Sequence, residues 1–229
     1  MRLFSNIISG MFHPLLMVTY GVVLALTFTY LAIYPPAMKL LLAGGAFLST
    51  AVIPGAFIFM MVKNGAAVDM ELSDRHERVV PYLIFITSIM VCAFYMYKMM
   101  LPFWFISLLL GACVALILAL LINFFWKIRP ASLPRSRNTT LALLINFFWK
   151  ISAHAIGTGG LLGGIMGVAR IHLINPYWAF IIVILIAGLV GTSRIFLKRH
   201  TPMQVYAGFC LGFICTFVAS FLSYIYLFI

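Results

Sequence analysis

The chain has little charge and very little acid. Only 8% of its 229 residues are charged, and four of them are Asp or Glu, whereas about 25% charge is usual in a soluble domain. This scarcity excludes an ordinary soluble globular protein. Apart from Lys98 at the end of an apolar run, the apolar runs also lack the charges that mark ion pathways. A channel or an ion transporter is therefore disfavoured.

Other absences narrow the choice further. No metal-ligand spacing such as H-E-x-x-H is present, so we expect neither a metal ion nor a cofactor. The first apolar run has no small-residue cleavage site after it, so we expect a mature helix rather than a signal peptide. The four cysteines all lie within apolar runs, where packing is their expected role.

What charge the chain has is basic. Fifteen Lys and Arg give a formal net charge of +11, which in a soluble protein would suggest a nucleic-acid partner. Here the basic residues stand between long apolar runs, where anionic lipid or a phosphate substrate is the nearer partner. We therefore expect membrane lipids and no nucleic acid.

Hydrophobic residues make up 65% of the chain and form long runs. A helix needs roughly 20 apolar residues to cross the hydrocarbon core. Six runs qualify, and a seventh is expected within 141–168: Leu15–Tyr34, Leu40–Val62, Pro81–Tyr97, Leu101–Trp126, Leu173–Thr192 and Val205–Ile229. The sequence thus predicts an all-α polytopic membrane bundle of about six to seven transmembrane helices, forming one integral membrane domain over 1–229.

Glycine is concentrated in the seventh run and repeats in the last. Its small-xxx-small spacing favours close helix packing over direct ligand contact. The residues are Gly157, Gly159, Gly160, Gly163, Gly164 and Gly167, followed by Gly208 and Gly212.

One eleven-residue stretch occurs twice without change. Leu-Ala-Leu-Leu-Ile-Asn-Phe-Phe-Trp-Lys-Ile stands at 118–128 and again at 141–151. Structural repeats diverge in sequence, whereas this copy is literal, so we interpret it as an inserted unit of 23 residues. The segment 128–151 contains the insertion, which leaves the number of domains unchanged.

Polar residues with useful chemistry gather in three loops. The first, 69–81, holds every acidic residue: Arg75 and Arg78 are planar donors suited to phosphate, and Asp74 or Glu77 can orient a partner. Two other interpretations of this loop are a metal site and a solvated loop whose charges pair with one another. The second loop carries Lys150, Ser152 and His154, and the third carries Ser193, Arg194, Lys198, Arg199, His200 and Gln204.

Counting spans places all three loops on one side of the membrane. Two histidines and several arginines then converge, and no metal is needed. Such a group suits phosphate-ester chemistry, in which one imidazole attacks phosphorus, the other protonates the leaving oxygen and guanidinium groups stabilise the phosphoryl oxygens. Histidine fits both roles because its ordinary pKa lies near 6.5.

Two of these loops resemble a known family. Ser193-Arg194, five residues and then His200 is similar to the S-R-x5-H part of the third motif of the type-2 phosphatidic acid phosphatase superfamily. Ser152-Ala153-His154 resembles its second motif, P-S-G-H. The resemblance implies that His200 is the nucleophile forming a phosphohistidine and His154 the acid for the leaving group. It further implies that Arg194 and Ser152 bind phosphate, to which we add Arg75, Arg78 and Lys150.

The chain departs from the family pattern at two places. Gln204 stands where the third motif has the aspartate that orients the nucleophile; it can accept a hydrogen bond but carries no charge, so Asp74 or Glu77 is a candidate substitute. The first motif, K-x6-R-P, is absent in that form, and the stretch with Arg75 and Arg78 is our best replacement.

These features predict a membrane phosphatase that hydrolyses lipid phosphate monoesters or pyrophosphates, with phospholipid or isoprenoid phosphates as substrates. Two alternatives stay open: a lipid phosphotransferase, and a catalytically silent relative that binds or translocates phospholipid. The resemblance implies a bacterial inner (cytoplasmic) membrane and a site facing outward, although a simple count of basic residues places the site in the cytoplasm.

Overall fold

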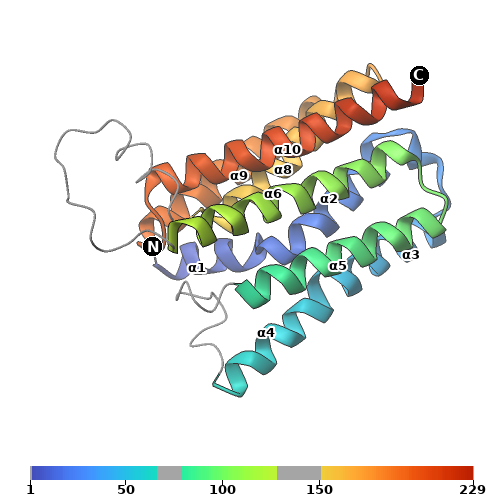
Figure 1. Ribbon diagram of the computed structural model, residues 1–229. Helices are drawn as coiled ribbons and strands as arrows, with labels where there is room; N and C mark the ends of the chain where they lie inside the picture. Colours follow the sequence, from blue (N-terminus) through green and yellow to red (C-terminus); the bar gives the residue numbers. More distant parts are fainter. Residues whose placement is uncertain (1, 66–78, 128–150, 229) are drawn as a thin grey trace.

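The computed structural model describes residues 2–65, 79–127 and 151–228. These ranges contain helices and no β-strand, and the helices lie side by side in one elongated bundle (Figure 1). The predicted all-α class is therefore confirmed. The helices are α1 (Arg2–Met11), α2 (Pro14–Phe28), α3 (Pro36–Phe47), α4 (Ile53–Lys63), α5 (Val79–Lys98), α6 (Phe103–Lys127), α8 (Ala153–Ile171), α9 (Tyr177–Phe196) and α10 (Pro202–Phe228), with a 3-10 turn η1 (Tyr30–Ile33) and a π-helical segment η2 (Leu48–Val52).

Five helices in the described part of the chain are long and apolar enough to cross a membrane. They are Pro36–Lys63, Val79–Lys98, Phe103–Asn123, Tyr177–Phe196 and Pro202–Ile225. The pair α1 and α2 makes a sixth if it counts as one span, although it bends by 57°. The helix expected within 141–168 is α8, which begins at Ala153 after the N-cap residue Ser152. Its glycines, His154 and Arg170 dilute its apolar character, so it is not among the five.

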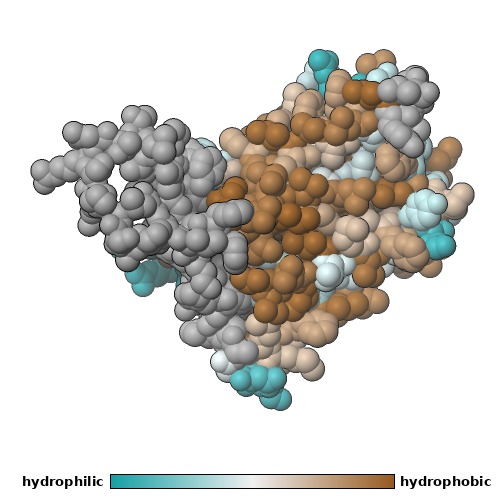
Figure 2. All heavy atoms as spheres, viewed as in Figure 1, coloured by the Kyte–Doolittle hydropathy of each residue, from teal (hydrophilic) through white to brown (hydrophobic). Residues whose placement is uncertain are grey.

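The outer surface of the bundle is apolar where lipid would contact it. Val91, Phe94 and Leu185 are each about 60% exposed, as are many other large apolar side chains. Figure 2 shows hydrophobic residues over the middle of one face and hydrophilic residues toward its ends. Soluble proteins rarely expose so large an apolar area to water. The chain is thus an integral membrane protein.

The span Pro36–Lys63 changes its hydrogen-bond pattern at η2. Pro54 follows η2 closely and has no N–H to donate, which leaves a carbonyl one turn earlier without its helical partner. The Ser49 and Thr50 hydroxyls donate to the Ala46 carbonyl, and Ser49 also donates to the Gly45 carbonyl. These carbonyls stand eight and nine residues before Pro54, so the hydroxyls support the turn that leads into η2 and do not replace the bond that Pro54 lacks.

The glycine-rich faces of α8 and α10 bring the two backbones into direct contact. A Cβ on Gly159 would collide with the Phe209 carbonyl, and one on Gly212 would collide with the Ile156 carbonyl. The Thr216 hydroxyl crosses the interface and donates to the Gly160 carbonyl at 2.9 Å. The predicted role of these glycines in helix packing is confirmed.

The repeated segment is only partly described. Its first copy forms the last turns of α6, and residues 141–150 of the second copy lie outside the described residues. Ile151, the last residue of that copy, is buried. Its Cγ2 would lie 3.2 Å from a Cβ on Gly208, so Ile151 packs against the start of α10.

Candidate active site

Three helix ends meet at one end of the bundle, beside α1. In Figure 1 the starts of α8 and α10 and the end of α9 lie at the same end, next to α1. The second and third predicted motifs are therefore together, as span counting predicted. Helix N-termini carry partial positive charge and free N–H groups, so the starts of α8 and α10 favour an anion here.

The turn after α9 sets Arg194 and His200 close together in the backbone. Lys198 has a φ of 55°, a left-handed conformation that ends the helix. Arg199 N–H then donates to the Arg194 carbonyl at 3.1 Å, and His200 N–H lies 3.3 Å from the same oxygen. Six residues of sequence thus fold back so that both motif residues, which are buried, reach one site.

A capping box at the start of α10 fixes the position of the Gln204 side chain. Thr201-Pro202-Met203-Gln204 is a capping box, with proline at the first helical position. Gln204 N–H donates to the Thr201 hydroxyl at 3.4 Å, and Thr201 N–H donates to Gln204 Oε1 at 3.1 Å. The same Oε1 lies 3.3 Å from His200 Nδ1. Because an amide oxygen only accepts, this contact places the proton of a neutral His200 on Nδ1 and leaves Nε2 with its lone pair.

His154 and Arg194 converge on a residue of α1. Arg194 Nη1 donates to Ser9 Oγ at 2.7 Å, and His154 Nε2 lies 3.2 Å from both the hydroxyl and the carbonyl oxygen of Ser9. All three residues are buried. The His13 ring stands edge-on to His154, with ring centroids 5.4 Å apart.

The surroundings of His154 favour its neutral form. Its burial and the nearby charge of Arg194 lower the pKa of His154 well below the ordinary 6.5, and His13 and His200 add to the shift. The hydrogen bond with the Ser9 carbonyl acts in the opposite direction. An anion bound here would offset the Arg194 charge and raise the pKa of His154 again.

Ser152 is fully buried at the start of α8. Its N–H donates to the Gln204 carbonyl at 3.3 Å, which ties α8 to α10. Its hydroxyl makes no hydrogen bond with any residue that the structure describes. A buried hydroxyl without a partner is costly and is typical of a group that awaits a ligand.

Other predicted site residues cannot be placed. Arg75, Arg78, Asp74 and Glu77 lie in 66–78, and Lys150 lies in 128–150, both outside the described residues. Their roles stay predictions. Within 2–65, 79–127 and 151–228, no three His, Cys, Asp or Glu side chains come together as a metal site.

Sequence reasoning missed α1 and the two residues that it and its turn bring to the site, Ser9 and His13. A signal was present: Ser5, Ile8 and Ser9 recur at helical spacing and are buried, while Leu3, Phe4, Ile7 and Met11 are exposed. This pattern is typical of an amphipathic helix at a membrane surface.

Comparison with known proteins identifies the family. A family model described as the PAP2 superfamily matches residues 102–226, which include all of α6, α8 and α9 and most of α10. The chain belongs to the PAP2 superfamily. No curated protein and no solved structure matches it. The resemblance to type-2 phosphatidic acid phosphatases is thereby confirmed, and the superfamily implies action on phosphate esters. Ser9 and His13 lie outside the segment that the PAP2 family model matches.

Proposed function

We propose that this PAP2 protein is a membrane phosphatase that hydrolyses lipid phosphate monoesters or pyrophosphates through a phosphohistidine on His200. The observation that carries the proposal is the meeting of His154, Arg194 and the His200–Gln204 pair at one end of an apolar bundle. Nothing in the proposed chemistry requires a metal ion.

The hydrogen bond to Gln204 suits His200 for attack. With the proton on Nδ1, the Nε2 lone pair forms a bond to phosphorus while the bond from phosphorus to the lipid oxygen breaks. The leaving oxygen takes a proton from His154. Water then attacks the phosphohistidine, the N–P bond breaks, free phosphate leaves and His154 recovers a proton from the water.

Phosphate recognition falls to Arg194, Ser152 and the helix N-termini in this proposal. A guanidinium and a buried hydroxyl donate to phosphoryl oxygens, and the charge of Arg194 also stabilises the developing negative charge. The bound phosphate raises the pKa of His154, so the acid becomes protonated when substrate is present.

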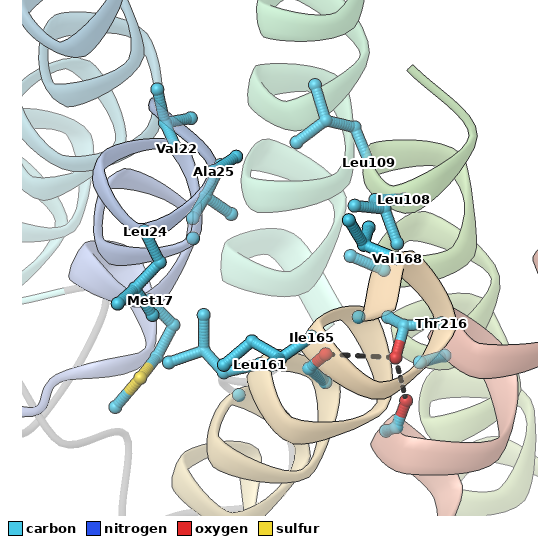
Figure 3. A pocket seen from close by; sticks show the side chains of 18 of the residues that line it. Met17, Val22, Leu24, Ala25, Leu108, Leu109, Leu161, Ile165, Val168 and Thr216 are labelled. Carbon is cyan, nitrogen blue, oxygen red and sulfur yellow. Dashed lines mark hydrogen bonds between the residues drawn. The ribbon is translucent and has the colours of Figure 1, made fainter. Parts of the chain in front are cut away.

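An apolar cavity beside the site supports a lipid substrate. Its volume is about 130 Å³, and it begins at Pro14 and Ala153, the neighbours of His13 and His154 in sequence. It follows α2 as far as Thr29, and 15 residues of helix measure about 22 Å. Figure 3 shows Met17 and Leu24 on one side of this space and Leu161 on the other. Its lining is apolar and rich in small residues, which suits a hydrocarbon chain.

Phosphate release tests the proposal. The chain and its His200→Ala variant would be assayed on phosphatidic acid, phosphatidylglycerol phosphate, isoprenyl pyrophosphate and lipid A, with EDTA present. We expect release by the unaltered chain and none by His200→Ala. His172→Ala is the matched control, because His172 packs against Tyr30 and Trp104 beyond the far end of α8; it should keep full activity. Equal release by His200→Ala, with the fold retained, would overturn the proposal.

A second candidate function is a silent relative that binds phospholipid without turnover. Gln204 favours it, because an uncharged partner cannot stabilise the imidazolium that forms as His200 attacks. This candidate predicts binding of phosphatidic acid vesicles with no phosphate release from any substrate in the panel.

A further inference from the structure

Ser9 occupies a position that no PAP2 motif accounts for. It lies 93 residues before the segment matched by the family model, yet its side chain contacts both Arg194 and His154. Arg194 Nη1 donates to Ser9 Oγ at 2.7 Å. The hydroxyl is also 3.2 Å from His154 Nε2.

The chemistry of a hydroxyl fits both contacts at once. Ser9 Oγ accepts from the Arg194 guanidinium through a lone pair and can donate its own proton to a neutral His154 Nε2. When His154 is protonated, Nε2–H can instead donate to the Ser9 carbonyl, also 3.2 Å away. One residue therefore offers a partner to His154 in either protonation state.

Contacts with neighbouring residues hold α1 in position, and they thereby keep Ser9 beside His154 and Arg194. Tyr20 donates to the Met11 carbonyl at 2.7 Å, and the Phe12 and Tyr20 rings pack 5.9 Å apart. Ser5 and Ile8 are buried on the side of α1 that carries Ser9. If Ser9 only blocked the site and moved away when substrate enters, α1 would have to break all of these contacts.

We propose that Ser9 is a positioning residue that aligns His154 and Arg194 for phosphoryl transfer. The proposal rests on the proposed function of the site and extends it to α1. Without the Ser9 hydroxyl, the guanidinium of Arg194 and the imidazole of His154 lose a hydrogen-bond partner and can shift. Small misplacements of reacting groups slow catalysis strongly.

The kinetic test compares Ser9→Ala, Ser9→Thr and Ser5→Ala. Ser5 is a buried serine one turn earlier on the same helix, so Ser5→Ala is the matched control. We expect kcat to fall about tenfold or more in Ser9→Ala, with a smaller change in KM. Ser9→Thr, which keeps the hydroxyl, should recover most of the activity, and Ser5→Ala should stay within about twofold of the unaltered chain.

Three kinetic results would overturn the proposal. Unchanged kcat in Ser9→Ala would show that the contact has no catalytic effect. Higher activity would show that Ser9 obstructs the site. Equal losses in Ser9→Ala and Ser9→Thr, together with a lower melting temperature in both, would show a purely structural role.

A second measurement separates this proposal from the proposed function. Nitrogen-15 spectra of labelled histidine report the state of His154 without turnover, and a His154→Asn spectrum identifies its signals among the five histidines. We expect the His154 signals to shift in Ser9→Ala and to stay in place in Ser5→Ala. If the unaltered chain releases no phosphate, the proposed function fails. Unshifted His154 signals in Ser9→Ala would refute the positioning role in either case.

Discussion

Replacing Gln204 with glutamate adds a negative charge beside His200 while keeping the geometry of the contact. Glutamate has the same length as glutamine and also forms a capping box with Thr201. Its carboxylate oxygen would lie where Gln204 Oε1 now lies, 3.3 Å from His200 Nδ1. Half a unit of positive charge developing on the imidazole would gain about 0.6 kcal/mol at the dielectric constant of water and about 2.5 kcal/mol at an effective value of 20.

These energies predict that Gln204→Glu raises kcat by between about threefold and about seventyfold. The assay is phosphate release from the best substrate at pH 7.5, with the melting temperature in detergent as a check on the fold. Gln204→Glu combined with His200→Ala should be inactive, because the added charge acts through His200. Gln204→Leu removes the acceptor and the cap together, so both kcat and the melting temperature should fall. A folded Gln204→Glu protein with unchanged or lower kcat would refute the reasoning.

Three further predictions concern the acid, the helix interface and the cavity. Because His154 must carry a proton to act as the acid and its pKa is lowered well below 6.5 in the free protein, kcat/KM should fall as pH rises through that lowered pKa, a fall that begins below pH 6.5, and His154→Asn should abolish that dependence; a flat profile in the unaltered chain would contradict the assignment. Gly163→Ala places a Cβ against the Phe213 carbonyl and should destabilise the fold by about 1–3 kcal/mol, whereas Gly188→Ala, whose Cβ meets nothing within 4 Å, should leave the melting temperature unchanged. Ala25→Phe fills the cavity and should raise KM severalfold for long-chain lipid phosphates but not for short-chain ones, while Val23→Phe, on an exposed position of the same helix, should change neither.

The bundle could be predicted from the sequence because the signal is simple. Apolar runs of about 20 residues leave the backbone little choice but helix in a membrane, and the glycine spacing in α8 and α10 indicated where two helices touch. The start of α8 was harder, since the literal repeat before it has the same apolar character as a helix. The π-helical segment η2 lies just before Pro54, and such a local change in hydrogen bonding cannot be predicted from apolar periodicity.

The site was predictable where residues adjacent in sequence carry its chemistry. Ser193-Arg194 and His200 are close in the chain, so a single turn brings them together, and the spacing alone indicated this. Ser9 is 145 residues from His154, and no local pattern links them. The capping role of Gln204 could be predicted from Thr-Pro-Met-Gln, because glutamine at the third helical position after threonine is typical of a capping box.

The most direct test of the central claim is to trap the covalent intermediate. The chain would be mixed with a lipid phosphate labelled with phosphorus-32, quenched within milliseconds to seconds, and analysed for label attached to protein. The proposed mechanism predicts label that survives alkali and is lost in acid, as expected of phosphohistidine, and no label in His200→Ala. Turnover without any labelled protein, or label that persists in His200→Ala, would contradict it.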